Sequence, residues 1–410
     1  MKKYFLFIII ILSTISVNSQ TADEYYKKAN IKRDSADCEG AIPDYTKAIE
    51  LNPFNALYYE GRAFCIKYTE VDKALLDYNK AIELRPANDE LFYARADFKD
   101  IFLKDYKGSI EDYTKAIELN PENDSYIGGR GGVKWFLEDY QGAIEDYTKA
   151  IELNPKFGYY YYYRGQIKSE LKDYKGALED YNKAIEVTSK DDYLDNRWYI
   201  SRANVKIELN EFNAAILDFN KAILLDPENQ EFYCARGNAK IMIQDYQGAI
   251  LNFSKAIELN PADYKSYADR GYAKYLLKQY VNSIEDYNKA INLNPKLSYA
   301  ILWRGKSKLE LEDYRGAISD FDLANTFTVN QDAIFFYRAE AKFKLKDYDG
   351  AILDFNASLK LDPNNASSYF NRGLSKISLE DTDGGCLDLS KAGELGMKEA
   401  YDLIRLFCVE

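Results

Sequence analysis

The chain has 410 residues, of which 29% are charged and 47% hydrophobic, and its formal net charge is −12. It contains no histidine, which excludes a Ser-His-Asp or Cys-His catalytic site, a histidine-ligated zinc and a haem held by a proximal histidine. The negative charge disfavours nucleic acid or an anionic membrane as the main partner, and the 37 Tyr and 21 Phe are too many for a disordered chain.

The amino-terminal segment differs from everything after it. Lys2 and Lys3 precede an unbroken apolar run over residues 4–12, and small polar residues follow up to Ser19. The apolar run is too short to span a membrane. This order is typical of a secretory signal peptide over residues 1–19, which we favour over an uncleaved membrane anchor. We therefore expect an exported protein that is periplasmic, displayed on the cell surface or secreted.

The rest of the chain repeats itself with a period of about 34 residues. Residues 143–155 have a near copy that ends at Pro121, and Ser189 and Val329 stand where two units lack the closing proline. We expect eleven units over residues 20–396. The prolines that close eight of the other units are Pro53, Pro86, Pro121, Pro155, Pro227, Pro261, Pro295 and Pro363.

Each unit predicts two helices. The first helix centres on a basic residue followed by Gly or Ala, and the second carries small residues with an aromatic between them, as in Ala143, Tyr147 and Ala150. Positions i, i+4 and i+7 share one helix face, so two backbones can approach while the ring fills the gap. The third unit has one extra residue between its helices, and four glycines fall within residues 128–132, which indicates either local flexibility or tight packing.

This pattern resembles the tetratricopeptide repeat family over essentially the whole chain after residue 19. The matching features are the period, the small residue of the first helix, the small–aromatic–small face of the second helix and the closing proline. The resemblance implies an all-α fold, a right-handed superhelical solenoid of antiparallel helix hairpins, with a concave groove lined by the first helices.

Two segments depart from the regular period. Residues 189–195 carry about four extra residues, which form either a flexible joint or, as we favour, a passive surface loop. Residues 397–410 alternate apolar and charged positions at helical spacing. We expect this last segment to form a capping helix over the final hydrophobic face.

Charged residues recur in nearly every unit and depart from the family pattern. The first helix carries an Arg and, four residues later, a Lys, and the second helix carries an Asp about sixteen residues after the Arg. Like charges at positions i and i+4 repel each other, and an acid placed between them makes the net interaction favourable. We therefore favour a structural charge ladder joining the two helices, as in Arg130, Lys134 and Asp146, Arg164, Lys168 and Asp180, and Arg270, Lys274 and Asp286.

The alternative is that these cations form a basic stripe facing the groove, which would grip an acidic peptide or a carboxylate terminus. One unit has Asn252 in place of the Asp. Arg236, Lys240 and Asn252 therefore mark the best single place for an outside anion.

The resemblance maps the family's groove-facing positions onto residues that differ between units. Aromatic side chains dominate this set, and Tyr combines a large rigid contact area with a hydroxyl group. The alternative for each ring is packing between neighbouring helices. The predicted groove residues are Trp135, Tyr159, Tyr162, Arg197, Tyr272, Tyr275, Lys306, Phe336 and Phe343.

Five cysteines make an odd number, and their pairing cannot be deduced from the sequence. Cys38 with Cys65, or Cys386 with Cys408, can join by a disulfide near one end of the chain. Free thiols packed between helices are the alternative.

The sequence predicts an exported scaffold that binds a protein or peptide partner in its groove, with no cofactor, no metal and no enzymatic role. It has no phosphate-binding loop and no Cys-x-x-Cys motif. The alternative function is a peptide-capturing chaperone or assembly factor of the cell envelope, in which the basic stripe holds acidic or carboxy-terminal segments. Steep weakening by salt is expected for the stripe and not for aromatic docking.

Overall fold

The computed structural model describes residues 20–188, 195–328 and 332–408. Within these ranges all regular secondary structure is helical and no strand occurs, which confirms the predicted all-α class. The predicted signal peptide lies outside the described residues, as do residues 189–194 of the predicted joint. The chain divides into two compact units, Met1–Leu194 and Asp195–Glu410.

The described part of the first unit contains five hairpins, each built from a first and a second helix that pack antiparallel. The first helices are α2 (Ala22–Asp34), α4 (Ala56–Ile66), α6 (Asp89–Phe98), α8 (Asp124–Phe136) and α10 (Gly158–Glu170). The second helices are α3 (Cys38–Leu51), α5 (Val71–Leu84), α7 (Tyr106–Leu119), α9 (Tyr140–Leu153) and α11 (Tyr174–Val187).

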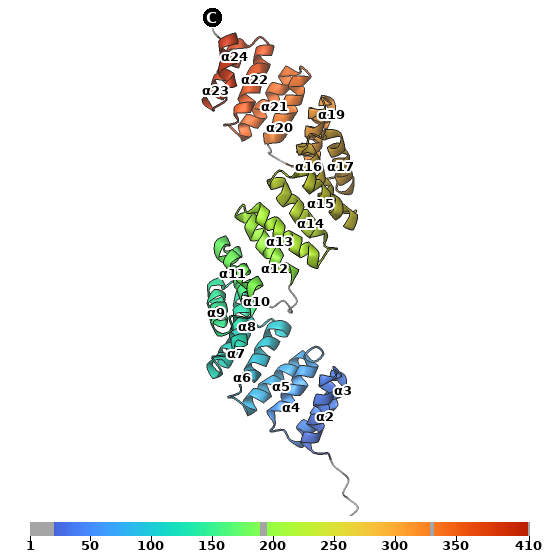
Figure 1. The fold of residues 1–410 in the computed structure, drawn as a ribbon, viewed down its shortest axis with the longest axis vertical. Coiled ribbons are helices and arrows are strands. Elements are labelled where there is room, and N and C mark those ends of the chain that lie inside the picture. Colours follow the sequence, from blue (N-terminus) through green and yellow to red (C-terminus); the bar gives the residue numbers. More distant parts are fainter. Residues whose placement is uncertain (1–19, 189–194, 329–331, 409–410) are drawn as a thin grey trace, which may run out of the picture. The chain divides into compact units, whose positions relative to one another are not determined.

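The described part of the second unit contains six hairpins and one further helix, α24 (Glu399–Phe407). The first helices are α12 (Asn196–Glu208), α14 (Gln230–Met242), α16 (Tyr264–Leu276), α18 (Ser298–Glu310), α20 (Asp332–Lys344) and α22 (Ala366–Ser378). The second helices are α13 (Phe212–Leu225), α15 (Tyr246–Leu259), α17 (Tyr280–Leu293), α19 (Tyr314–Phe327), α21 (Tyr348–Leu361) and α23 (Thr382–Glu394). Within each unit, every hairpin lies beside the next in chain order (Figure 1), which is the predicted solenoid of antiparallel hairpins.

A tight turn with a local cap joins the helices of most hairpins. Between α8 and α9, Glu138 adopts a left-handed backbone conformation (φ 62°). Asp139 then accepts a hydrogen bond from the Gly142 backbone N–H at 3.1 Å. Its carboxylate thus satisfies one of the donors left open at the start of a helix.

In most hairpins the two helices pack through a ring of the second helix against a Gly or Ala of the first. Phe253 of α15 is fully buried, and a Cβ on Gly237 of α14 would lie 2.8 Å from its ring. Ala249 and Ala256 are also fully buried on the same helix as the ring. The small–aromatic–small face therefore brings the two backbones together, as the sequence pattern predicts.

The extra residue of the third repeat is accommodated by a change of helix type. The chain leaves α6 through a π-helical segment, η1 (Lys99–Leu103), in which the wider turn takes up one additional residue. Lys104 then adopts a left-handed conformation (φ 55°) and closes the segment. This hairpin consequently keeps the pairs of an Arg and a Lys with an Asp that the other hairpins have.

The carboxy-terminal helix α24 covers the last hairpin. Its Ala400 is fully buried in one cluster with Leu389 and Ala392 of α23. A disulfide joins Cys386 to Cys408, with their Cα atoms 5.8 Å apart. The other predicted pair, Cys38 and Cys65, consists of free thiols whose sulfur atoms lie 2.6 Å apart, and Cys234 is also free.

Candidate functional site

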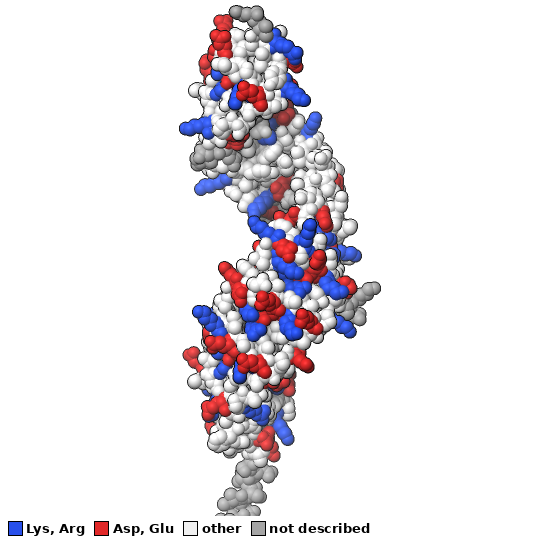
Figure 2. Space-filling view, turned by 90° about the vertical axis from the view of Figure 1, so that its left-hand side faces the viewer, with Lys and Arg blue, Asp and Glu red and all other residues white. Residues whose placement is uncertain are grey.

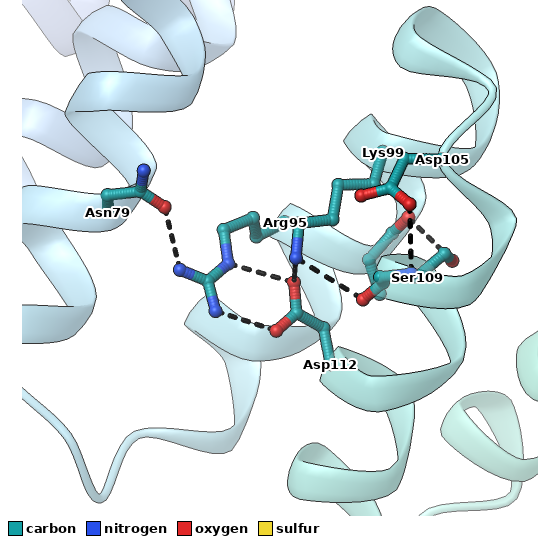
Figure 3. Close-up of polar contacts among 8 residues, drawn as sticks. Asn79, Arg95, Lys99, Asp105, Ser109 and Asp112 are labelled. Atoms are coloured by element: carbon teal, nitrogen blue, oxygen red, sulfur yellow. Dashed lines mark hydrogen bonds and ion pairs between the residues drawn. The ribbon is translucent and has the colours of Figure 1, made fainter.

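Figure 3 shows the charge ladder in the hairpin of α6 and α7. The Arg95 guanidinium donates two hydrogen bonds to the Asp112 carboxylate, from Nε at 2.8 Å and from Nη2 at 2.6 Å. Lys99 Nζ lies 2.8 Å from the same carboxylate. The acid of the second helix therefore lies between two cations that come from the first-helix side of the hairpin.

In the described residues this pairing of an Asp with one or both cations occurs in ten hairpins. The Arg–Asp distance is 2.7, 2.6 and 2.7 Å, and the Lys–Asp distance 2.8, 2.8 and 2.7 Å, in the sets of Asp146, Asp180 and Asp286. These three Asp side chains are only 5–7% exposed. Removing one partner from such a buried pair strands the other charges away from water.

The arginine also reaches the preceding hairpin. Arg95 Nη1 donates to Asn79 Oδ1 of α5 at 2.7 Å (Figure 3). Arg130 Nη1 donates in the same way to Thr114 Oγ1 of α7 at 3.1 Å. Because the guanidinium is planar and carries donors on three nitrogens, one side chain ties together three helices.

This geometry supports a structural role for the charge ladder and argues against a basic stripe. The Arg and Lys side chains direct their charged groups at the Asp of their own hairpin, and its carboxylate compensates one of the two positive charges within the fold. On the face drawn in Figure 2, basic and acidic side chains are interleaved and form no continuous basic band.

The hairpin of α14 and α15 is the exception, because it has Asn252 in place of the ladder Asp. Arg236 Nε donates to Asn252 Oδ1 at 2.7 Å, and Lys240 Nζ pairs with Asp245 at 3.1 Å. Burial lowers the pKa of Arg236, whereas the hydrogen bond to an Asp raises the pKa of Arg62 in another hairpin. The predicted anion site is thus brought together only in part, because Lys240 already binds an acid.

The predicted groove residues of the first unit differ in exposure. Trp135 Nε1 donates to Glu170 at 3.1 Å, and Tyr159 is half-buried. Tyr162 is only 5% exposed, because its ring packs against Tyr181 of α11 with the centroids 5.8 Å apart. The expectation that Tyr162 lines an open groove is therefore wrong.

Three predicted residues of the second unit make local contacts. Arg197, at the start of α12, donates from Nε to Asp195 at 2.5 Å, and its side chain is 69% exposed. Phe336 and Phe343 are partly buried and pack against the core of their own hairpin, where Phe355 is fully buried.

Tyr272, Tyr275 and Lys306 meet in one aromatic cluster. The Trp303 ring lies 4.6 Å from Tyr272 and 4.9 Å from Tyr275, measured between centroids. Lys306 Nζ lies 3.8 Å from the Trp303 centroid and donates to the Tyr337 hydroxyl at 3.0 Å. This is a cation held over aromatic rings. Trp303 and Tyr337 are not among the predicted residues, and their shared position directly before the repeated Arg is the signal that points to them.

A pocket of about 570 Å³ opens beside this cluster, entirely within the second unit. Residues from the first helices line most of it, and the predicted Tyr272 is one of them. The sequence did not single out the others: Phe212 and Phe219 hold repeated aromatic positions that every hairpin core needs, whereas residues such as Met242 and Asp269 hold positions that vary between repeats and follow no pattern. The lining residues are Asn204, Ile207, Asn210, Phe212, Phe219, Ala235, Asn238, Ala239, Ile241, Met242, Asp269, Tyr272 and Tyr299.

Asp269 of α16 is the only charged residue in the pocket lining. Burial raises the pKa of its carboxyl to about 6, and the negative charge of Asp263 acts in the same direction. Lys265 opposes this shift without forming an ion pair with Asp269. The pocket therefore combines apolar walls, amide groups and a desolvated acid, which is the composition of a ligand site.

Family models of the tetratricopeptide repeat match the chain at residues 22–55, 90–123, 129–192, 198–229, 230–263 and 264–297, and a model described as TPR repeat matches residues 339–376. The chain is built from tetratricopeptide repeats. No curated protein matches it.

Among the solved repeat structures that are similar to it are the following two. The carboxy-terminal part of a TPR repeat-containing protein from Cytophaga hutchinsonii is 19% identical and has a TM-score of 0.51, over 61% of this chain and 99% of that one. The hetero-tetramer Cut9–Hcn1 of the APC/C is 15% identical with a TM-score of 0.48, over 95% of this chain and 90% of that one.

The tetratricopeptide repeats of this chain thus separate two kinds of residue. The charge ladder is nearly the same in each hairpin and its groups pair with one another, whereas most of the pocket residues differ from repeat to repeat. Among residues 20–188, 195–328 and 332–408, no helix has the length and apolar character needed to cross a bilayer. That part of the chain also brings no three potential metal ligands together.

Proposed function

We propose that the chain is an exported interaction scaffold, whose eleven repeats hold a protein or peptide partner against their first helices. The observation that carries the proposal is the pocket of about 570 Å³, lined mostly by residues of α12, α14, α16 and α18 that differ between repeats. A scaffold needs repeated residues for stacking and unrepeated residues for specificity, and the pocket gathers the second kind. The proposal assigns the chain no catalytic step and no cofactor.

Export is supported by the pattern of residues 1–19 and by the Cys386–Cys408 disulfide, since disulfides persist mainly in oxidising compartments. The mass of the protein purified from the envelope or the culture medium tests this. We expect a chain that begins at or near Gln20. Recovery of only the full-length chain in the cytosol would contradict export.

Docking is expected to depend more on apolar and aromatic contact than on a basic stripe, because the ladder cations are already paired. Partner binding should therefore weaken only modestly between low and high salt. A steep loss of binding with salt would instead favour the peptide-capturing alternative.

Site-specific photo-cross-linking tests the proposed surface. A photoreactive amino acid placed at Asn238, in the pocket, should cross-link a partner in the envelope fraction. The matched control is Leu217 of α13, which is 65% exposed and is not part of the pocket lining. Substitution Tyr272→Leu should reduce the product at position 238. No product at 238, or the same products at both positions, would reject the pocket as the docking surface.

A further inference from the structure

The pocket of the second unit combines apolar walls with a single acid, and this combination favours some partner side chains over others. Its walls are formed mainly by apolar and aromatic side chains, including Ile207, Ile241 and Met242. Asn204 and Asn238 add amide groups, and Asp269 adds the single charge. An apolar enclosure that contains one acid disfavours a second acid strongly and a neutral side chain only mildly.

The Asp269 carboxylate has no partner within the described chain. None of the hydrogen bonds or ion pairs among the described residues includes it, although α16 also carries Lys265 and the ladder residues Arg270 and Lys274. Arg270 and Lys274 instead direct their charged groups at Asp286. By contrast, ten repeated acids of the described hairpins each bind at least one cation.

We propose that this pocket receives a lysine or arginine side chain from an extended segment of the partner protein, with Asp269 as the acceptor. The inference rests on the proposed function and specifies the partner's chemistry. The aliphatic stem of the incoming residue packs against Ile241 and Met242, and its cationic end reaches the carboxylate. The rings of Tyr272 and Tyr299 line the same pocket and favour a cation over a neutral group.

Charge complementarity separates this occupant from an acidic one. The chain carries a formal net charge of −12, which attracts a basic segment before contact is made. An aspartate or glutamate entering the pocket would face Asp269 in a desolvated space, where like charges repel. The general attraction acts over the whole surface, so the experiment must separate it from the contact with one residue.

The test uses peptides selected from a random heptapeptide library on the purified protein. The best binder is then synthesised in capped form with Lys, norleucine or Glu at its basic position, and affinity is measured by fluorescence polarisation. Norleucine keeps the stem of lysine and removes its charge. We expect the Lys peptide to bind about tenfold or more tightly than the norleucine peptide, the scale of a charged hydrogen bond.

Two variants locate the effect. Asp269→Asn should abolish the preference for Lys over norleucine. The matched control is Glu60→Gln in the first unit, which removes one charge from another half-buried carboxyl whose pKa is also raised by burial. This variant should keep the preference intact, because it changes the net charge by the same amount.

Equal binding of the Lys and norleucine peptides, or a preference that survives in Asp269→Asn, would overturn the inference while leaving peptide binding in place. A library that yields no binder would overturn the inference as well. In that event the cross-linking result at Asn238 decides separately whether the proposed function stands.

Discussion

The Arg130 guanidinium joins α8 to α9 through two parallel hydrogen bonds to the Asp146 carboxylate, 2.9 Å from Nε and 2.7 Å from Nη2. Lys134 Nζ lies 2.8 Å from the same acid, and Arg130 also donates to Thr114 of the preceding hairpin. One carboxylate therefore supports both the closure of a hairpin and, through the arginine, its attachment to its neighbour.

Replacing Asp146 with Asn should destabilise the first unit. The substitution leaves the Arg130 and Lys134 side chains, which are 20% and 19% exposed, without their acid. Stranding partly buried cations costs about 2–4 kcal/mol, somewhat less than a fully buried pair. Urea unfolding followed by far-ultraviolet circular dichroism measures the loss.

The control for this change is Glu152→Gln on the same helix α9. Glu152 pairs with Lys149 at 2.9 Å, but its side chain is 59% exposed. An exposed pair contributes about 0.2–1 kcal/mol, so the control should unfold almost like the wild type. If the two variants unfold alike, the ladder has no structural role.

Asn252→Asp should stabilise the protein, because it supplies the acid missing from the hairpin of α14 and α15. Arg236 Nε already points at Asn252 Oδ1 from 2.7 Å, and a carboxylate there would accept a second hydrogen bond and draw in Lys240. The variant gives up the bond from Asn252 Nδ2 to the Gly248 carbonyl oxygen. We expect a net gain of about 1 kcal/mol in unfolding free energy.

The reverse change in the neighbouring hairpin provides the comparison. Asp218 accepts from both Arg202 and Lys206, and Asp218→Asn should destabilise the second unit by about 2–4 kcal/mol. A lower denaturation midpoint for Asn252→Asp would contradict the view that this hairpin lacks only its acid.

The glycine-rich start of the fourth repeat allows a third prediction. A Cβ at Gly129 would lie 2.6 Å from the Tyr113 ring, whereas a Cβ at Gly132 would meet only the Tyr147 hydroxyl at 3.4 Å. Gly129→Ala should therefore destabilise the fold by about 1–3 kcal/mol through overpacking. Gly132→Ala should be neutral or stabilising by up to about 1 kcal/mol, because alanine favours the helix. Thermal unfolding distinguishes the pair, and equal effects would contradict tight packing at Gly129.

The repeated features could be predicted from the sequence, and the unrepeated ones could not. The residues that form each hairpin and each Arg–Asp pair recur at the same position in nearly every repeat. A single exception such as Asn252 therefore does not obscure the pattern. The burial of Tyr162 depends on Tyr181 of the next helix, and nothing in a run of five tyrosines says which ring faces inward.

The pocket was beyond prediction for a related reason. Its acid, Asp269, shares the pocket with Asn204, Asn238 and Tyr299, which come from three other helices. Such a site depends on the stacking of four repeats, and the residue spacing within one repeat does not predict it.

Cys38 and Cys65 should form a disulfide in an oxidising buffer. Their sulfur atoms lie 2.6 Å apart across α3 and α4, and the loop between them spans 27 residues. Oxidised glutathione would take two electrons and the two thiol protons, giving one protein disulfide and two reduced glutathione molecules. We expect a gain of about 2–4 kcal/mol in stability. Peptide mapping without reduction detects the bond, and alkylation of both thiols after oxidation would contradict it.

Asp269 should make stability depend on pH in a way that its amide variant does not. Its pKa is about 6 in the folded state because burial disfavours the charge, against an ordinary value of 3.8. A raised carboxyl pKa means that the folded state holds the proton more tightly than the unfolded state. The ionised acid therefore lowers stability above pH 6, and this cost fades as the pH falls towards 4.

Asp269→Asn should consequently be more stable than the wild type at pH 7.5, by on the order of 1–3 kcal/mol, and equal to it near pH 4. The groups that face Asp269 are Asp263 and Lys265 beside it, Cys234 on α14, Tyr287 on α17 and Tyr299 on α18. Asp263 and Lys265 oppose each other, and the thiol and the phenols stay neutral over this range because burial raises their pKa values. Urea unfolding of both proteins at pH 4, 6 and 7.5 measures the difference, and a constant difference across the three values would show that Asp269 is already solvated or paired.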